Sequence, residues 1–220
     1  MRTIPDAPMI WKTLATLALC GLSACGSVSI TAQTTTLPRQ SKPLSNVVAF
    51  VGDSITHRWD LTQYDPNPTL NFGVDADTTV QMLARFGDVL AAAPGVVVIL
   101  GGINDLQVFG PSAANTDSIE AMASMAKAAG IRVILCSVMP TTDFQYATLH
   151  FTLADIRAFN DSLIQIARAN GYLYADYYDE FLNADGTVND SLYMDGLHPN
   201  ASGYAKMWTV VAPLIDEDLQ

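Results

Sequence analysis

The sequence has few basic residues. Lysine and arginine together number 11, whereas aspartate and glutamate number 22, which gives a formal net charge of −11 at pH 7. A chain with this excess of negative charge is repelled by phosphate backbones and by anionic lipid headgroups. We therefore expect neither nucleic acid nor an anionic lipid surface among its partners.

The sequence also lacks an apolar run long enough to span a bilayer. The uncharged stretch at residues 13–24 is shorter than the roughly 20 residues that a membrane-spanning helix needs. It follows Arg2 and Lys12 and ends in small residues, which is the layout of a secretory signal. Residues 22–25, Leu-Ser-Ala-Cys, close this stretch and resemble the lipobox of bacterial lipoproteins, in which the cysteine, here Cys25, is acylated.

This resemblance implies a signal peptide over residues 1–24 and a lipid on Cys25. It places the protein in the bacterial cell envelope, on the periplasmic or outer-membrane side, with the lipid as its only contact with the membrane. An ordinary secretory signal with an incidental cysteine is the alternative.

Cysteine is scarce as well, with three in the whole chain. Cys20 lies inside the predicted signal and Cys25 is the predicted lipid site, so only Cys136 belongs to the folded domain. An internal disulfide is then impossible. Because apolar residues precede Cys136, we expect a buried small side chain rather than a reactive thiol.

The rest of the chain divides into a tether and one domain. Residues 25–45 are rich in Ser, Thr, Gln and Pro without an amphipathic period, which predicts a flexible tether. The globular domain is expected over residues 46–220.

Within this domain, short apolar runs alternate with longer segments of helical period. Runs rich in Val, Ile and Leu suit strands that are covered on both faces, as in a parallel sheet. The alternation predicts a three-layer, doubly wound α/β domain, whose binding sites lie beyond the carboxyl ends of the strands. The predicted strands are residues 47–51, 69–72, 96–100, 131–136 and 172–175, and the predicted helices are residues 79–92, 117–129, 152–169 and about 201–214.

Gly52, Asp53 and Ser54 follow the first run directly. A serine at a strand-to-helix turn has its hydroxyl at the carboxyl edge of the sheet, where the N–H groups of the next helix can face a developing oxyanion. The same tripeptide is also typical of an ordinary helix N-cap, so by itself it is a weak indication of a nucleophile.

Gly73 follows the second run, and Gly101, Gly102 and Asn104 follow the third. Glycine lets a carbonyl oxygen approach a backbone N–H, and an asparagine amide can donate to the same oxygen without titrating. Turn chemistry explains each of these loops adequately when it is taken alone.

Near the C-terminus, Asp195 precedes His198 by three residues. Gly196 permits a turn between them, and Pro199 restricts His198 to an extended conformation. Such a turn can aim the carboxylate at one ring nitrogen and leave the other for Ser54, whose hydroxyl needs a base held in the correct tautomer. We expect the motif to lie beyond a further strand and immediately before the last helix.

Together, these four segments resemble the SGNH hydrolases, also called the GDSL esterase and lipase superfamily, over about residues 47–214. The superfamily is named for a serine, a glycine, an asparagine and a histidine in separate blocks, which here are Ser54, Gly73, Asn104 and His198. The resemblance implies a flavodoxin-like α/β/α fold with a five-stranded parallel sheet. It also implies a carboxylic ester hydrolase that needs no cofactor.

The resemblance assigns roles to these residues. It implies a catalytic triad of Ser54, Asp195 and His198. It implies an oxyanion hole made by the N–H groups of Ser54 and Gly73 with the side chain of Asn104.

Two departures bear on the substrate. The first block reads Gly-Asp-Ser-Ile rather than Gly-Asp-Ser-Leu, as is common in the branch with lysophospholipase-like and acetylhydrolase-like members. The second block has Ala76 where many relatives carry another glycine, which can alter the loop beside the acyl pocket.

Because short segments between the strands leave little material for a lid, we expect a small acyl group such as acetyl. The resemblance also permits lysophospholipids and thioesters.

Two other histidines compete with His198 for the role of base. His57 follows Ser54 by three residues but has no aspartate at a matching turn, so we expect it on the rim or surface. His150 is expected in a solvated loop after the fourth predicted strand, and the alternative is that it borders the substrate cleft.

Two alternatives to the esterase are weighed against these residues. Asp53 and Asp105, with Asp195 and His198, could hold a hard metal ion in a phosphoesterase, but that reading gives Ser54 no role. Asp53 and Asp105 are instead expected to brace their loops through backbone N–H groups. A surface lipoprotein that binds glycans and keeps an idle triad is the non-enzyme alternative.

Overall fold

The computed structural model describes residues 44–65, 68–111, 114–143 and 151–216. The predicted signal peptide, Cys25, nearly all of the tether and His150 lie outside the described residues. The first strand begins at Leu44, two residues before the predicted start of the domain. Of the helices in the described ranges, none has the length and apolar character needed to cross a membrane.

Five strands form one sheet in the order β2-β1-β3-β4-β5, and every pairing is parallel. All seven residues of β3 are buried, since this strand lies in the middle of the sheet with helices on both faces. The predicted strands and the predicted parallel sheet are confirmed. The strands are β1 (Leu44–Gly52), β2 (Thr69–Gly73), β3 (Pro94–Leu100), β4 (Arg132–Cys136) and β5 (Leu173–Ala175).

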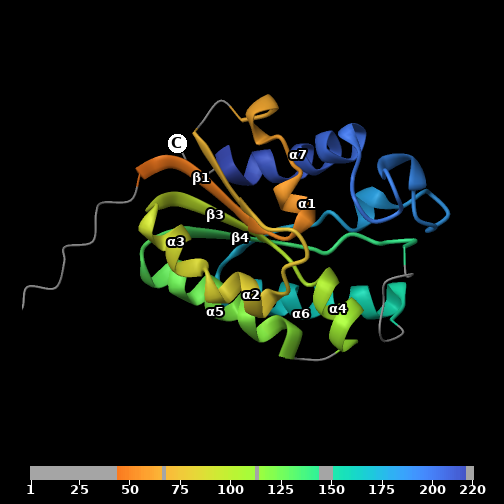
Figure 1. The fold of residues 1–220 in the computed structure, drawn as a ribbon, viewed down its shortest axis with the longest axis horizontal. Coiled ribbons are helices and arrows are strands. Elements are labelled where there is room, and N and C mark those ends of the chain that lie inside the picture. The colour runs from red at the N-terminus through yellow and green to blue at the C-terminus, as the bar shows by residue number, and fades with distance from the viewer. Residues whose placement is uncertain (1–43, 66–67, 112–113, 144–150, 217–220) are drawn as a thin grey trace, which may run out of the picture. The chain divides into compact units, whose positions relative to one another are not determined.

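Helices cover both faces of the sheet, which makes three layers (Figure 1). On one face lie α1 (Ser54–His57) and α7 (Ala201–Asp216). On the other lie α2 (Thr79–Ala84), α3 (Phe86–Ala91), α4 (Ile103–Phe109), α5 (Ala114–Ala128) and α6 (Leu153–Asn170). Three short 3₁₀ helices, η1 (Leu61–Gln63), η2 (Asp179–Phe181) and η3 (Asp190–Leu192), lie in the connections. The strand order is that of flavodoxin, so the predicted fold is confirmed.

One predicted helix is interrupted. Residues 79–92 form α2 and α3 rather than a single helix, because the backbone leaves the helical conformation at Arg85, with φ −106° and ψ 4°. The side chain of Arg85 turns instead toward the carboxyl ends of β1 and β2, where it hydrogen bonds to two carbonyl groups.

The motif from Asp195 to His198 lies beyond β5 and directly before α7, as expected. Beside it, Tyr193 pairs with Pro199 in an isolated bridge, and the side-chain amide of Asn200 donates to the carbonyl groups of Ser191 and Tyr193.

The sheet topology fixes where a site can form. β1 continues into α1 on one face of the sheet, whereas its neighbour β3 continues into α4 on the other face, so a site can form between these two connections at the carboxyl ends of the strands. Ser54 lies directly after β1, Gly73 is the last residue of β2, and Asn104 lies in the first turn of α4.

Candidate active site

Ser54 is the first residue of α1, directly beyond β1. Asp53 caps this short helix by accepting the N–H of Ile55 at 2.9 Å. Gly52 is required just before the turn, since a Cβ there would lie 2.0 Å from Oγ1 of Thr56. The turn leaves the Ser54 side chain close to the surface, with 8% of the residue exposed.

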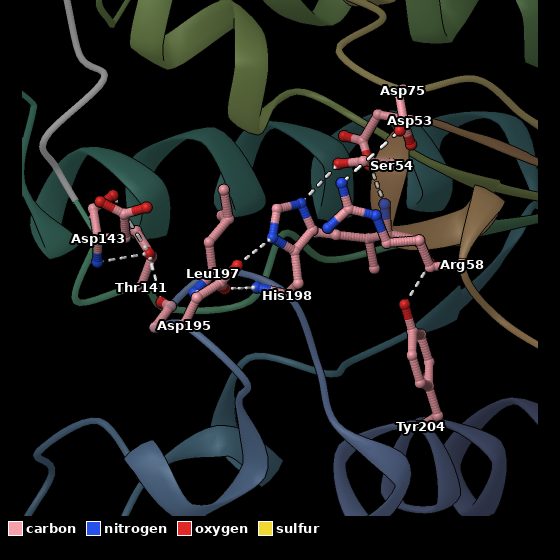
Figure 2. Close-up of polar contacts among 12 residues, drawn as sticks. Asp53, Ser54, Arg58, Asp75, Thr141, Asp143, Asp195, Leu197, His198 and Tyr204 are labelled. Carbon is pink, nitrogen blue, oxygen red and sulfur yellow. Dashed lines mark hydrogen bonds and ion pairs between the residues drawn. The ribbon is translucent and has the colours of Figure 1, made fainter.

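The turn at residues 195–198 brings the imidazole to this serine. Oδ1 of Asp195 accepts the backbone N–H groups of Leu197 (3.1 Å) and His198 (2.7 Å), and Gly196 adopts a positive φ of 83°. Figure 2 shows the result: Oδ2 of Asp195 lies 2.7 Å from Nδ1 of His198, and Nε2 of His198 lies 3.0 Å from Oγ of Ser54. Residues 144 positions apart in the chain thus form one hydrogen-bonded series.

The partners of the imidazole determine its proton positions. Ionised Asp195 can only accept, so Nδ1 carries the hydrogen, and neutral Nε2 can accept from the Ser54 hydroxyl. Partial burial works to raise the pKa of Asp195, but hydrogen bonds from the backbone and ring of His198 and from Leu197 outweigh it. The pKa therefore lies below the ordinary value of 3.8. The carboxylate is ionised at neutral pH and can stabilise an imidazolium.

Other contacts support the turn and were not predicted. Oγ1 of Thr141 donates to the carbonyl of Gly196 at 2.7 Å, and the N–H of Thr142 donates to the same oxygen at 3.1 Å. On the nucleophile side, the hydroxyl of Tyr204 in α7 donates to the carbonyl of Ile55 at 2.9 Å (Figure 2). No local sequence pattern marks these residues, because each contact joins segments far apart in the chain.

Asn104 lies in the first turn of α4, at the same carboxyl edge of the sheet as Ser54. Its side-chain amide donates to the carbonyl of Asp77 at 2.9 Å, so Asn104 is joined to the loop between β2 and α2. The amide has a second hydrogen, which that contact does not use.

Gly73 requires a correction as an oxyanion donor. Its N–H already donates to Oδ1 of Asn71 at 2.8 Å, so it does not offer a free hydrogen to a substrate. The close packing of β2 against α1 explains why a glycine is needed at position 73. A Cβ there would lie 2.1 Å from the backbone nitrogen of His57.

Ala76, in the same loop, has a backbone conformation that the sequence did not reveal. Its φ is 63°, in the left-handed region that favours glycine. Within the described ranges, no hydrogen bond involves the N–H of Ala76. The neighbouring Asp77 is the residue whose carbonyl accepts from Asn104, so the amide of Ala76 lies in the loop that Asn104 contacts.

Asp53 and Asp105 each accept a backbone N–H at the start of a helix, Ile55 in α1 and Thr79 in α2. Asp105 accepts the N–H of Thr79 at 2.8 Å and the hydroxyl of the same residue at 2.6 Å. Asp53 is 1% exposed. Burial, with a smaller contribution from the charge of Asp105, raises the pKa of Asp53 from 3.8 to about 7 despite the opposing hydrogen bond from Ile55.

The other candidates take no part in the series. Nδ1 of the exposed His57 lies 3.1 Å from the carbonyl of Gly73, a contact at the end of β2. Across the described ranges, no three His, Cys, Asp or Glu side chains are grouped so that they could hold a metal ion. Cys136 is a buried free cysteine, and burial raises the pKa of its thiol to about 12.

A groove of about 230 Å³ lies between the segment after α1 and the segment around Pro199. Its lining residues are near Ser54 and His198 in the sequence, but Ser54, Asp195 and His198 do not line it. Its lining combines aromatic and polar side chains and includes Arg58, Trp59, Gln63, Tyr64, Met194 and Tyr204.

The chain is similar to known proteins over most of this domain. The model of the GDSL-like lipase/acylhydrolase family matches residues 50–206. A protein from Bacteroides fragilis NCTC 9343, assigned as an acylhydrolase, is 28% identical with a TM-score of 0.73, and the alignment covers 82% of this chain and 92% of that one. A GDSL-like lipase from Bacteroides thetaiotaomicron VPI-5482 is 29% identical with a TM-score of 0.71, covering 80% of this chain and 92% of that one.

A more distant solved structure shares the fold. A catalytic mutant of an acetylxylan esterase from Geobacillus stearothermophilus is 18% identical with a TM-score of 0.61, covering 80% of this chain and 96% of that one. At this identity, the likeness concerns the fold alone. No curated protein matches the sequence.

Proposed function

Because the chain belongs to the GDSL-like lipase and acylhydrolase family, we propose that it is a serine esterase that removes short acyl groups, acetyl above all, from a polar alcohol. The observation that carries this proposal is the series of contacts from Asp195 through His198 to Ser54, with distances of 2.7 and 3.0 Å. Such a series is what an otherwise weak serine nucleophile needs.

The first half of the reaction forms an acyl-enzyme. Nε2 of His198 takes the proton of the Ser54 hydroxyl while Oγ attacks the ester carbonyl, which gives a tetrahedral intermediate with a negative oxygen. The imidazolium, stabilised by Asp195, then gives its proton to the departing alcohol. In the second half, His198 deprotonates a water molecule that attacks the acyl group, and the imidazolium then returns the proton to Oγ of Ser54 as the acid leaves.

The negative oxygen of the intermediate needs hydrogen-bond donors aimed at it. We assign this role to the N–H of Ser54 at the start of α1 and to the side-chain amide of Asn104. In place of the engaged N–H of Gly73, the proposal takes the free N–H of Ala76, since this residue lies in the loop that Asn104 contacts.

We assign the alcohol portion of the substrate to the groove, because its lining comes from the segments that follow Ser54 and flank His198 in the chain. Aromatic and polar side chains line it together, as is typical of sites that bind small molecules through apolar contact and a few hydrogen bonds. The acetylxylan esterase with the same fold makes acetylated glycans the first class of substrate to try.

The proposal is tested by hydrolysis of p-nitrophenyl esters of increasing acyl length. We expect kcat/KM to fall by roughly tenfold or more from acetate to octanoate, because the short connections between the strands leave little apolar material to cover the added methylenes. Ser54→Ala should abolish the activity, and a metal chelator should leave it unchanged. Acetylated xylo-oligosaccharides and a lysophospholipid, compared under one condition, then identify the alcohol. Activity that survives Ser54→Ala would contradict the mechanism, and a preference for octanoate would contradict the acyl length.

A further inference from the structure

We infer that Arg85 is a positioning residue that holds the nucleophile turn and the oxyanion-binding loop in one arrangement. The inference deepens the proposed function and depends on it, since it concerns the same site. Arg85 touches neither Ser54 nor His198 in the described structure. It would act through the backbone and side chains that it contacts.

The guanidinium group of Arg85 bonds three segments at once. Its Nη2 donates to the carbonyl of Gly52 at 2.9 Å, and its Nη1 donates to the carbonyl of Phe72 at 2.7 Å. These are the ends of β1 and β2, from which the nucleophile turn and the second loop depart. Its Nε donates to Oδ2 of Asp77 at 2.6 Å, which adds an ion pair within that second loop.

The contact with Asp77 leads to the oxyanion donors. Asp77 is 8% exposed, so its carboxylate depends on Arg85 for its charge partner. The carbonyl of the same residue accepts from the side-chain amide of Asn104 at 2.9 Å, and Ala76 precedes it directly. A shift of Asp77 would therefore move both proposed donors, Ala76 and Asn104, relative to Ser54.

The chemistry of arginine suits this role. A planar guanidinium carries five N–H donors in a fixed arrangement, whereas the lysine ammonium is a flexible point charge that cannot reproduce the same three directions. The side chain of Arg85 is only 23% exposed, so its bonds are largely sheltered from solvent. The interruption between α2 and α3 occurs at this same residue, where the backbone leaves the helix.

The test is a double-mutant comparison with Asn104. We expect Arg85→Met to lower kcat on p-nitrophenyl acetate by roughly 10- to 100-fold with little change in KM, because displaced donors cost transition-state stabilisation rather than binding. In the background of Asn104→Ala, the same substitution should lower kcat less, since one of the two donors that Arg85 positions is already absent. Arg157→Met in α6 is the matched control, because Arg157 pairs with the exposed Asp179 and should leave kcat unchanged.

Two further measurements separate positioning from a loss of fold. Methylguanidine added to Arg85→Met should restore part of kcat, and Arg85→Lys should restore little. Asp77→Asn keeps the shape of the side chain, removes the ion pair, and should lower kcat in the same Asn104-dependent way if Arg85→Met does not fold.

Equal losses of kcat in the presence and absence of the Asn104 amide would overturn the inference. That result would leave the esterase proposal intact as long as Ser54→Ala remains inactive. Activity that does not depend on Ser54 would instead overturn the proposed function itself.

Discussion

Replacing Asp53 by asparagine should change how the stability of the domain depends on pH. Burial raises the pKa of Asp53 to about 7 in the folded protein, against an ordinary value of 3.8. Below pH 3.8 the carboxyl group is neutral in both states. As the pH rises from there, only the unfolded chain ionises, so the free energy of unfolding falls until the folded protein ionises at about pH 7.

The magnitude follows from the size of this difference. Each pKa unit corresponds to about 1.4 kcal/mol, so the full contribution between acid and neutral pH is about 4 kcal/mol. Of this, roughly 2.5 kcal/mol is lost between pH 5 and pH 8. Asparagine cannot ionise but can still accept the N–H of Ile55, as Oδ1 of Asp53 does. The Asp53→Asn variant should therefore lack this part of the pH dependence.

The assay is urea unfolding at pH 5, 6, 7 and 8. Relative to the unchanged protein, Asp53→Asn should gain roughly 2.5 kcal/mol of stability between pH 5 and pH 8. Asp161→Asn, at an exposed position of α6, is the matched control and should show no such gain. If Asp53→Asn and the unchanged protein lose stability in parallel with rising pH, then the carboxyl group at position 53 is not held neutral by burial and the reasoning fails.

Further predictions concern the oxyanion donors and the N-terminus. Asn104→Ala should lower kcat by roughly 10²- to 10³-fold, the effect of losing one oxyanion donor, and an unchanged kcat in the folded variant would remove Asn104 from the mechanism. Ala76→Gly should raise the free energy of unfolding by about 1 kcal/mol or less, because glycine adopts a positive φ without strain. Ala93→Gly, at a φ of 49°, is its control: both variants should stabilise the fold in chemical denaturation, but only the change at Ala76 should alter kcat. Cys25→Ser should abolish incorporation of labelled fatty acid and release the protein from the membrane fraction of a bacterial host, and continued labelling would refute the lipid site.

The sequence predicted the sheet because its strands carry a strong signal. Strands buried on both faces are nearly continuous runs of Val, Ile and Leu. Because parallel strands run in one direction, the loops that follow them all lie at the same edge of the sheet. Ser54 and the turn from Asp195 to His198 were predictable for a related reason. The acid and base lie three residues apart, so a local turn settles most of their geometry.

Other parts of the site could not be predicted from local patterns. The N–H of Gly73 donates to the side chain of Asn71. The residue types do not indicate whether this N–H would bond to Asn71 or to a substrate oxygen. The break at Arg85 depends on carbonyl groups 33 and 13 residues away in the chain, so a helical period alone could not reveal it.

The series that joins Ser54 to His198 spans 144 positions of the chain. A chain that has been synthesised only as far as the third strand already contains Ser54, but it does not yet contain His198, which removes the proton of the Ser54 hydroxyl. Ester cleavage thus begins only when the last turn before α7 has docked, and the appearance of activity during refolding would report completion of the whole domain rather than formation of the sheet.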